Sequence, residues 1–232
     1  MSTIIQCRGV EKTYRQGAVD VPALRGIDLD IQSGDFATLA GPSGSGKTTL
    51  LSLIGGLDRP TAGEISVDGE PITAMDKNRL ADLRLHKVGF VFQTYSLIPV
   101  LSALENVEFI LRLLDVPQRQ REARAREVLR EVGLEGLEKR RPARLSGGQQ
   151  QRVAVARALG PKPAIVLADE PTANLDSKNA EELIALMARL NASSGITFLI
   201  ATHDPRVMAH SRRRIEMIDG RITADERQAV PA

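Results

Sequence analysis

Two glycine-rich segments of this chain have the composition of phosphate-binding helix N-termini. The first runs from Gly41 to Thr48, and its Gly-x-x-x-x-Gly-Lys-Thr spacing is that of a phosphate-binding loop. Backbone N–H groups and the positive end of the helix dipole bind anions there, and glycine lets the backbone approach them closely. The residues expected to contact a nucleotide in this segment are Gly41, Pro42, Ser43, Gly44, Ser45, Gly46, Lys47, Thr48 and Thr49.

Lys47 and Thr48 have the side chains that such a loop needs for catalysis. The lysine would reach the β- and γ-phosphates, and the threonine hydroxyl would be a ligand of Mg²⁺. An apolar run, Ile165 to Ala168, ends in two acids, Asp169 and Glu170. Beside a phosphate loop we expect Asp169 to hold Mg²⁺ and Glu170 to orient or deprotonate the attacking water. The alternative is that the two acids only cap the end of a strand.

The second glycine-rich segment, Leu145 to Gln149, begins roughly a hundred residues after the first. Its expected phosphate contacts are Ser146, Gly147, Gly148 and Gln149. One compact core cannot easily bring both segments to the same nucleotide. The sequence therefore predicts either two ligands or one ligand held between two copies of the protein. A helix cap with a flexible entry is the alternative for this segment.

Length and charge restrict the class of protein. A chain of 232 residues forms one domain, or one domain with an insertion, and can bury a substantial core. The net charge of +2 argues against broad attraction to nucleic acid, so no nucleic-acid partner is expected. In the stretch 119–144 glutamates alternate with arginines, which favours a solvated helix face over an RNA- or lipid-binding patch.

Several sequence features indicate a soluble, cytosolic chain. The N-terminus lacks the features of a signal peptide. Apolar runs fall short of the roughly 20 residues that span a bilayer, and the longest, 97–116, is interrupted by Glu105, Glu108 and Arg112. The single cysteine, Cys7, lies in an apolar strand-like stretch, where we expect it to pack in the core, and it suits a reducing compartment.

The pattern of apolar residues predicts an α/β core of mostly parallel strands with a helical insertion. Lys47 to Ile54 continues at helical spacing after the phosphate loop, and most of 96–159 is also helical, with Pro117 ending one helix. A further helix is expected at 178–190. Strands are expected at 4–10, 27–31, 36–40, 63–69, 88–92, 165–168 and 197–201, with a terminal hairpin at 214–223.

These motifs, in this order, make nearly the whole chain resemble the ATP-binding subunit of ABC transporters. The segment Leu145-Ser-Gly-Gly-Gln149 is identical to the signature of that family. The resemblance implies that Ser146 and Gly148 contact the γ-phosphate of an ATP held by the phosphate loop of a partner, so that a head-to-tail homodimer encloses two ATPs. It also implies a P-loop NTPase core (1–93 and 160–232) with an antiparallel β subdomain, and a helical subdomain at about 94–159, all within a single domain, 1–232.

Four further residues match functional positions of the family. Gln93 follows a predicted strand, where the family has a glutamine that contacts Mg²⁺ and water. His203 resembles the switch histidine, which contacts the γ-phosphate and positions the water together with Glu170. Tyr14 is placed like the aromatic residue that stacks on adenine, although a packing tyrosine is the alternative. Asp176 resembles the key carboxylate of a loop that crosses the dimer interface, although it could also cap the following helix.

The resemblance also implies a membrane partner. In the family, a groove beside Gln93 and the start of the insertion, here 93–106, receives a short cytoplasmic helix of an integral membrane permease. The apolar residues within 95–101 suit such docking and equally suit the core of the insertion. Together with 104–107 and 57–63, they look like the bacterial subgroup of lipoprotein release, macrolide and peptide export, and haem efflux. The expected location is therefore cytoplasmic and peripheral, on the cytoplasmic face of the bacterial inner membrane.

Two other classes share the same cassette. Soluble ABC ATPases act on nucleic acid or ribosomes, but they usually carry two cassettes, long coiled coils or zinc insertions, which this sequence lacks. Regulatory ATPases of the cell-division type transport nothing. The chain ends soon after its last predicted hairpin, which leaves no room for the C-terminal regulatory domain of some importers and favours export or force transmission. The cargo is not encoded here, since cargo contacts lie on the membrane subunit.

Overall fold

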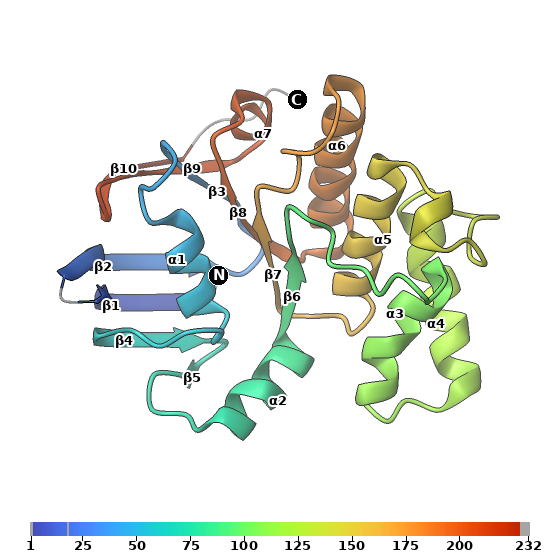
Figure 1. Cartoon of the computed structure of the whole chain (residues 1–232), viewed down its shortest axis with the longest axis horizontal. Helices are drawn as coiled ribbons and strands as arrows, with labels where there is room; N and C mark the ends of the chain where they lie inside the picture. Colours follow the sequence, from blue (N-terminus) through green and yellow to red (C-terminus); the bar gives the residue numbers. More distant parts are fainter. Residues whose placement is uncertain (1, 18, 228–232) are drawn as a thin grey trace.

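The computed structural model describes residues 2–17 and 19–227 and contains two β-sheets and a group of helices (Figure 1). The smaller sheet is antiparallel, with strand order β2-β1-β4-β5. The larger sheet has the order β10-β9-β3-β8-β7-β6, and all its pairings are parallel except that of β10 with β9. The predicted α/β class, with a mostly parallel sheet, is therefore confirmed.

The elements have the following bounds. The strands are β1 (Thr3–Gln16), β2 (Val19–Gln32), β3 (Phe36–Ala40), β4 (Ala62–Val67), β5 (Glu70–Pro71), β6 (Val88–Val91), β7 (Ile165–Asp169), β8 (Thr197–Thr202), β9 (Arg213–Ile218) and β10 (Arg221–Arg227). The helices are α1 (Lys47–Ile54), α2 (Lys77–Lys87), α3 (Ala103–Leu113), α4 (Gln118–Glu131), the short 3₁₀ helix η1 (Pro142–Arg144), α5 (Gly147–Leu159), α6 (Ser177–Ser194) and α7 (Pro205–Ala209).

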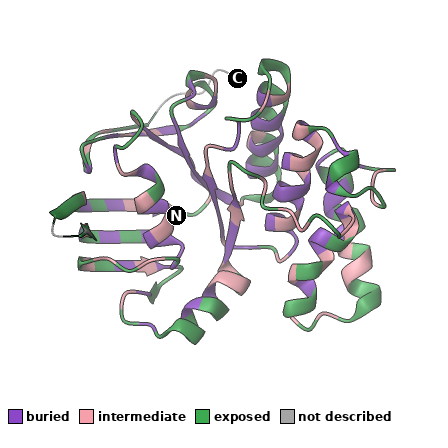
Figure 2. Ribbon diagram, in the orientation of Figure 1, coloured by how far each residue is buried: buried purple, intermediate pink, exposed green. Residues whose placement is uncertain are grey.

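The strands of the larger sheet are buried on both faces. Every residue of β3 and of β8 is buried, as expected of parallel strands covered by helices on each side. This is why these strands have continuous apolar sequences, and Figure 2 shows them as a buried band through the centre of the molecule. The carboxyl ends of β3, β7 and β8 lie at one edge of the sheet, because the three strands are parallel neighbours. Residues that follow these strands therefore meet at that edge.

The strands of the smaller sheet are longer than the sequence suggested. The strand predicted at 4–10 continues to Gln16, and the strand predicted at 27–31 begins at Val19. The two strands pair over their whole length with several register shifts, and the outer part of β2 is exposed. Backbone pairing continues there without a buried face, so the apolar alternation that identifies a strand is missing.

Two helices were also missed. In α2 only Leu80 and Leu83 are buried, so its apolar stripe is too thin to recognise; Asp76 caps it by accepting hydrogen bonds from two backbone N–H groups. The other, α7, is five residues long. The remaining predicted helices and strands are present with shifted ends.

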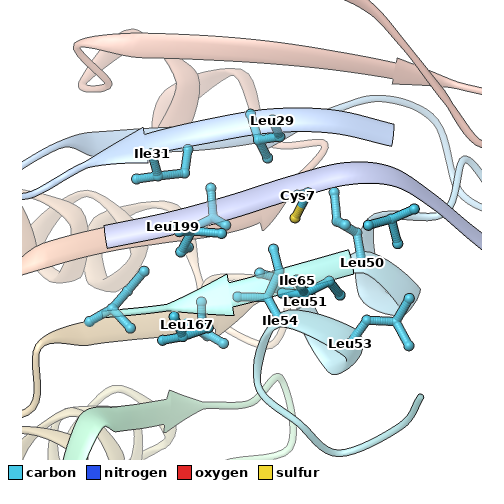
Figure 3. Packing of buried hydrophobic residues seen from close by; sticks show 14 of the residues in the cluster. Cys7, Leu29, Ile31, Leu50, Leu51, Leu53, Ile54, Ile65, Leu167 and Leu199 are labelled. Carbon is cyan, nitrogen blue, oxygen red and sulfur yellow. The ribbon is translucent and has the colours of Figure 1, made fainter. Parts of the chain in front are cut away.

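Two clusters of buried side chains hold these layers together. One lies between the smaller sheet, α1 and one face of the larger sheet, and includes Cys7, Leu50 and Leu199 (Figure 3). Cys7 is completely buried, which confirms its predicted packing role. The other cluster joins the opposite face of the larger sheet to α5, α6 and the helical group of α3 and α4, at the right of Figure 1. Among the described residues, no helix combines the length and apolar character needed to cross a membrane.

Candidate nucleotide site

The phosphate loop joins β3 to α1 and depends on glycine at both ends. Gly46 caps α1 in the left-handed conformation, with φ of 100°, and a Cβ there would lie 2.7 Å from the Ala23 carbonyl oxygen. A Cβ on Gly41 would collide with the backbone carbonyl of Met217. Gly44, with φ of 81°, faces open space. The backbone around the loop therefore fixes Gly41 and Gly46, while Gly44 leaves room for a ligand.

Lys47 lies at the start of α1 and its side chain folds back into the loop. Its Nζ donates hydrogen bonds to the carbonyl oxygens of Gly41 and Pro42, at 2.7 and 2.8 Å, and the residue is only 7 % exposed. An ammonium group held in the hollow of a glycine-rich loop, beside a helix N-terminus, concentrates positive charge where a phosphate would bind.

Thr48 and Asp169 bring two oxygen ligands together across the phosphate loop. The Thr48 hydroxyl donates to Asp169 Oδ1 at 3.0 Å, although the residues are 121 positions apart. Burial raises the pKa of Asp169, and the Thr48 hydrogen bond offsets part of that rise. Mg²⁺ prefers hard oxygen ligands and usually takes only one or two from the protein, with phosphate and water supplying the rest. This pair fits that donor set.

Glu170 and His203 follow the neighbouring strands β7 and β8 and are in contact. Nδ1 of His203 lies 2.7 Å from Oε1 of Glu170, and the Thr202 hydroxyl donates to Oε2 at 3.3 Å. Glu170 has a φ of 44°, uncommon for a residue with a side chain, and its N–H donates to the Ala201 carbonyl oxygen. The Glu170 side chain is 16 % exposed and that of His203 67 %. The carboxylate is thus fixed at the edge of the sheet, with the imidazole reaching into solvent.

A single cavity of about 420 Å³ is lined by about half of the predicted site residues. Its walls come from the phosphate loop, from the segment after β6 and from the ends of β7 and β8. The lining residues are Ala23, Ser43, Gly44, Gly46, Lys47, Thr48, Thr49, Gln93, Glu170, Ala173 and His203. Residues from five separate parts of the sequence therefore surround one cavity with a lysine, a carboxylate and an imidazole.

Tyr14 lies outside this lining, on the smaller sheet. Its hydroxyl donates to Asp58 Oδ2 at 3.0 Å, and Nζ of Lys12 lies 4.8 Å from the ring centre. The residue is 37 % exposed, so one part of the ring is open to a ligand. Burial raises the pKa of the Tyr14 hydroxyl, so the group stays neutral.

The signature segment begins α5. The Ser146 hydroxyl accepts a hydrogen bond from the Gln149 N–H at 3.3 Å, and the Gln149 side chain accepts one from the Ser146 N–H at 3.0 Å, which is a capping box. A Cβ on Gly147 would lie 2.9 Å from the Tyr95 hydroxyl oxygen, and one on Gly148 2.5 Å from Asn179 Oδ1. Within the described chain, none of 145–149 lines the 420 Å³ cavity. The two glycine-rich segments are thus apart in one copy.

The loop after β7 connects the signature to the cavity. Asp176 caps α6, accepting from the N–H and side-chain amide of Asn179 at 2.8 and 2.7 Å, and these contacts lower its pKa. Asn174 donates its amide to the Gln93 carbonyl oxygen at 2.9 Å. Sequence patterns do not indicate that contact, because it joins residues 81 positions apart.

These features define a P-loop ATPase with the signature of ABC cassettes, and the chain belongs to the ABC transporter family. The family model described as "ABC transporter" matches residues 24–173. The chain is 48 % identical over 229 residues to the lipoprotein-releasing system ATP-binding protein LolD of Anaeromyxobacter dehalogenans, with 95 % of this chain and 93 % of that protein covered. It is 45 % identical over 229 residues to the macrolide export ATP-binding/permease protein MacB 1/2 of Paracoccus denitrificans, covering 99 % of this chain and 34 % of that protein.

Solved structures agree with this assignment. The ATP-binding cassette MJ0796, solved as a dimer in a post-hydrolysis state bound to ADP and Pi, is 42 % identical, with a TM-score of 0.90 and coverage of 97 % of this chain and 98 % of that one. The predicted family, P-loop fold and ATPase activity are therefore confirmed, and the chain binds and hydrolyses ATP. The nucleic-acid and cell-division alternatives are not favoured.

Proposed function

We propose that two copies of this chain enclose two ATP molecules head to tail and drive an integral membrane permease. The observation that carries the proposal is the separation of the signature from the nucleotide cavity within one copy. A second copy can bring Ser146 and Gly148 to the phosphates that Lys47 holds. The related cassette MJ0796 forms dimers in its solved structures, which supports this arrangement. In the proposal residues 94–159 form the subdomain that carries the signature.

The predicted site residues then have separate roles in ATP binding and hydrolysis. Lys47 and the loop N–H groups bind the phosphates. Glu170 takes the proton of the attacking water, and His203 orients the Glu170 carboxylate and that water. Mg²⁺, held by Thr48 and Asp169 with Gln93 nearby, would neutralise the charge that develops on the phosphate oxygens. Tyr14 offers its ring to adenine, and Asp176 faces the second copy.

The permease is proposed to dock in a groove of about 400 Å³ between α2, β6, α3 and α5. Apolar walls with two arginines would suit a short apolar helix that carries an acidic side chain. Of the segment 94–106, only Ser96 lines this groove; Leu97 packs on the helical core and Val100 is 69 % exposed. The lining includes Leu57, Arg84, Leu85, Phe90, Phe92, Ile110 and Arg157.

The relatives indicate which transporters this chain would serve. Lipoprotein-releasing ATP-binding proteins match it over nearly their full length, and export proteins named ATP-binding/permease match over about a third of theirs. We place this chain with those two groups, in export or force transmission, on the cytoplasmic face of the bacterial inner membrane.

The substitution Glu170→Gln tests the proposed site. It keeps the size of the side chain and removes the proton acceptor, so turnover should fall by about 10²-fold or more, while ATP affinity stays within about twofold. The unhydrolysed nucleotide should hold the dimer closed, which size exclusion in saturating ATP would measure. A variant that stays monomeric under these conditions, or that still turns over ATP at the original rate, would contradict the proposal. The control is Glu181→Gln, an exposed glutamate of α6.

A further inference from the structure

Gln151 lies in α5, five residues after Ser146, and is completely buried. Its Nε2 donates to two backbone carbonyl oxygens, that of Phe92 at 3.3 Å and that of Pro171 at 2.9 Å. Phe92 directly precedes Gln93, and Pro171 directly follows Glu170. One amide therefore bridges the two backbone segments that carry these site residues, from the helix that the signature begins.

The orientation of this amide is determined by its neighbours. Both contacts are carbonyl oxygens, which accept hydrogen bonds, so only the Nε2 side of the amide can face them. The other end, Oε1, is buried and has no hydrogen-bond partner among the described residues. A buried unpaired acceptor loses its hydrogen bonds to water, so a glutamine here carries an energetic penalty that an apolar residue would avoid. That penalty argues for a role beyond packing.

We propose that Gln151 is a positioning residue through which the signature helix sets the places of both Gln93 and Glu170. The inference rests on the roles proposed above for those two residues. A phosphate of the partner's ATP at Ser146 acts on the N-terminus of α5, and a movement of that helix reaches both catalytic segments through one side chain. The strained backbone of Glu170, with φ of 44°, makes its carboxylate sensitive to a displacement of the next residue.

A second residue of α5 contacts the segment that follows Gln93 but not the segment of Glu170. Arg157 donates to the carbonyl oxygens of Tyr95 and Ser96, two residues with positive φ that follow Gln93. Within 2–17 and 19–227 this arginine has no carboxylate partner, and burial lowers its pKa. It also lines the proposed docking groove. Arg157 therefore contacts only the Gln93 segment, whereas Gln151 contacts both the Gln93 and the Glu170 segments.

The test is Gln151→Met in the full-length chain, which keeps the length and volume of the side chain and removes the donors. A misplacement of about 1 Å can cost about 10²-fold in rate, so kcat should fall roughly 10- to 100-fold. KM for ATP should stay within about twofold, because the phosphate loop is untouched. In a Gln93→Ala background the loss caused by Gln151→Met should shrink, since part of its effect passes through Gln93. If the methionine variant does not fold, Gln151→Asn keeps the amide but cannot reach both carbonyls, and the same loss of kcat is expected.

A matched control separates positioning from stability. Asn191 is another buried amide, in α6, and donates to the carbonyl oxygens of Gly34 and Ile196 at 3.0 and 2.7 Å, away from the cavity. Asn191→Leu should lower the melting temperature while kcat stays unchanged. The inference is overturned if Gln151→Met likewise lowers only the melting temperature and leaves kcat normal. It is also overturned if Gln151→Met lowers kcat by the same factor in the Gln93→Ala background as in the wild-type background. Turnover that survives Glu170→Gln would instead contradict the proposed function.

Discussion

Ser146 has a role in its own chain and a proposed role in the second copy. Its hydroxyl caps α5, and its backbone N–H donates a hydrogen bond to the Gln149 side chain. The Ser146 side chain therefore has a fixed position before any ligand binds. The structure thus bears out the helix cap that the sequence offered as the plain interpretation. A cap and a phosphate contact are compatible, because both use the exposed N-terminus of the same helix.

The substitution Ser146→Asp separates these two roles. Aspartate caps helices about as well as serine, so the melting temperature should stay within about 2 °C. Its negative charge, however, would repel the γ-phosphate of the partner's ATP, so ATP-dependent dimerisation and turnover should be lost. Light scattering and phosphate release measure the two effects. Asp76→Ser, the reverse exchange at the cap of α2, is the control and should change neither. Normal turnover in Ser146→Asp would exclude a phosphate at this helix.

Asp169 allows a prediction about pH. Its folded-state pKa is raised by burial, so the ionised carboxylate destabilises the nucleotide-free fold at neutral pH, and this cost disappears as the pH falls through the raised value. Asp169→Asn should therefore raise the melting temperature at pH 7 without nucleotide. The gain should shrink as the pH falls toward the ordinary aspartate range. Magnesium-dependent turnover should be lost in the same variant. A lower melting temperature at pH 7 would show that the carboxylate stabilises the free protein.

At the scale of elements, the sequence predicted best where burial was complete. The strands β7 and β8 and the helix α1 have apolar runs bounded by glycine or acidic residues, so both their type and the residues at their ends could be predicted. Helix α2 and the outer halves of β1 and β2 could not be predicted from the sequence. These elements are largely exposed to solvent, so they have too few regularly spaced apolar residues to show a helix or strand period. Gln151 and Arg157 were also missed, since helical periodicity shows which face is buried but not which strand ends it meets.

The groove between α2, β6, α3 and α5 gives a prediction at this scale. Leu57 lines the groove and is 51 % exposed, so a charge there should disturb docking without disturbing the core. In Leu57→Asp, binding to inner-membrane vesicles of the native host should fall about tenfold, while the ATPase activity of the purified chain stays unchanged. Val19→Asp, at a 63 % exposed position outside the groove, should bind vesicles normally. Equal binding of both variants would place the permease elsewhere.

At the scale of the whole molecule, the proposed site belongs to a pair of chains. A two-fold pair forms two sites, each with a phosphate loop from one copy and a signature from the other. A loop defect in one chain and a signature defect in the other therefore fall in the same site and leave the second site intact.

Mixing two inactive variants tests this directly. Lys47→Ala removes the phosphate contact of the loop, and Ser146→Asp blocks the signature. In an equimolar mixture half of the dimers combine one chain of each kind, and each such dimer has one intact site, so about a quarter of the normal turnover should return. Each variant alone is the control and should be inactive. A mixture as inactive as its parts would mean that each chain completes its own site.

The complete burial of Cys7 has a practical consequence for all of these measurements. It is the only thiol of the chain, and burial raises its pKa to about 12, so it is neither reachable nor ionised in the native protein. A maleimide or disulfide reagent should react only when the small antiparallel sheet opens. The labelling rate thus reports unfolding from a single intrinsic probe, and cysteines introduced at the surface for fluorophores can be labelled selectively without replacing the native one.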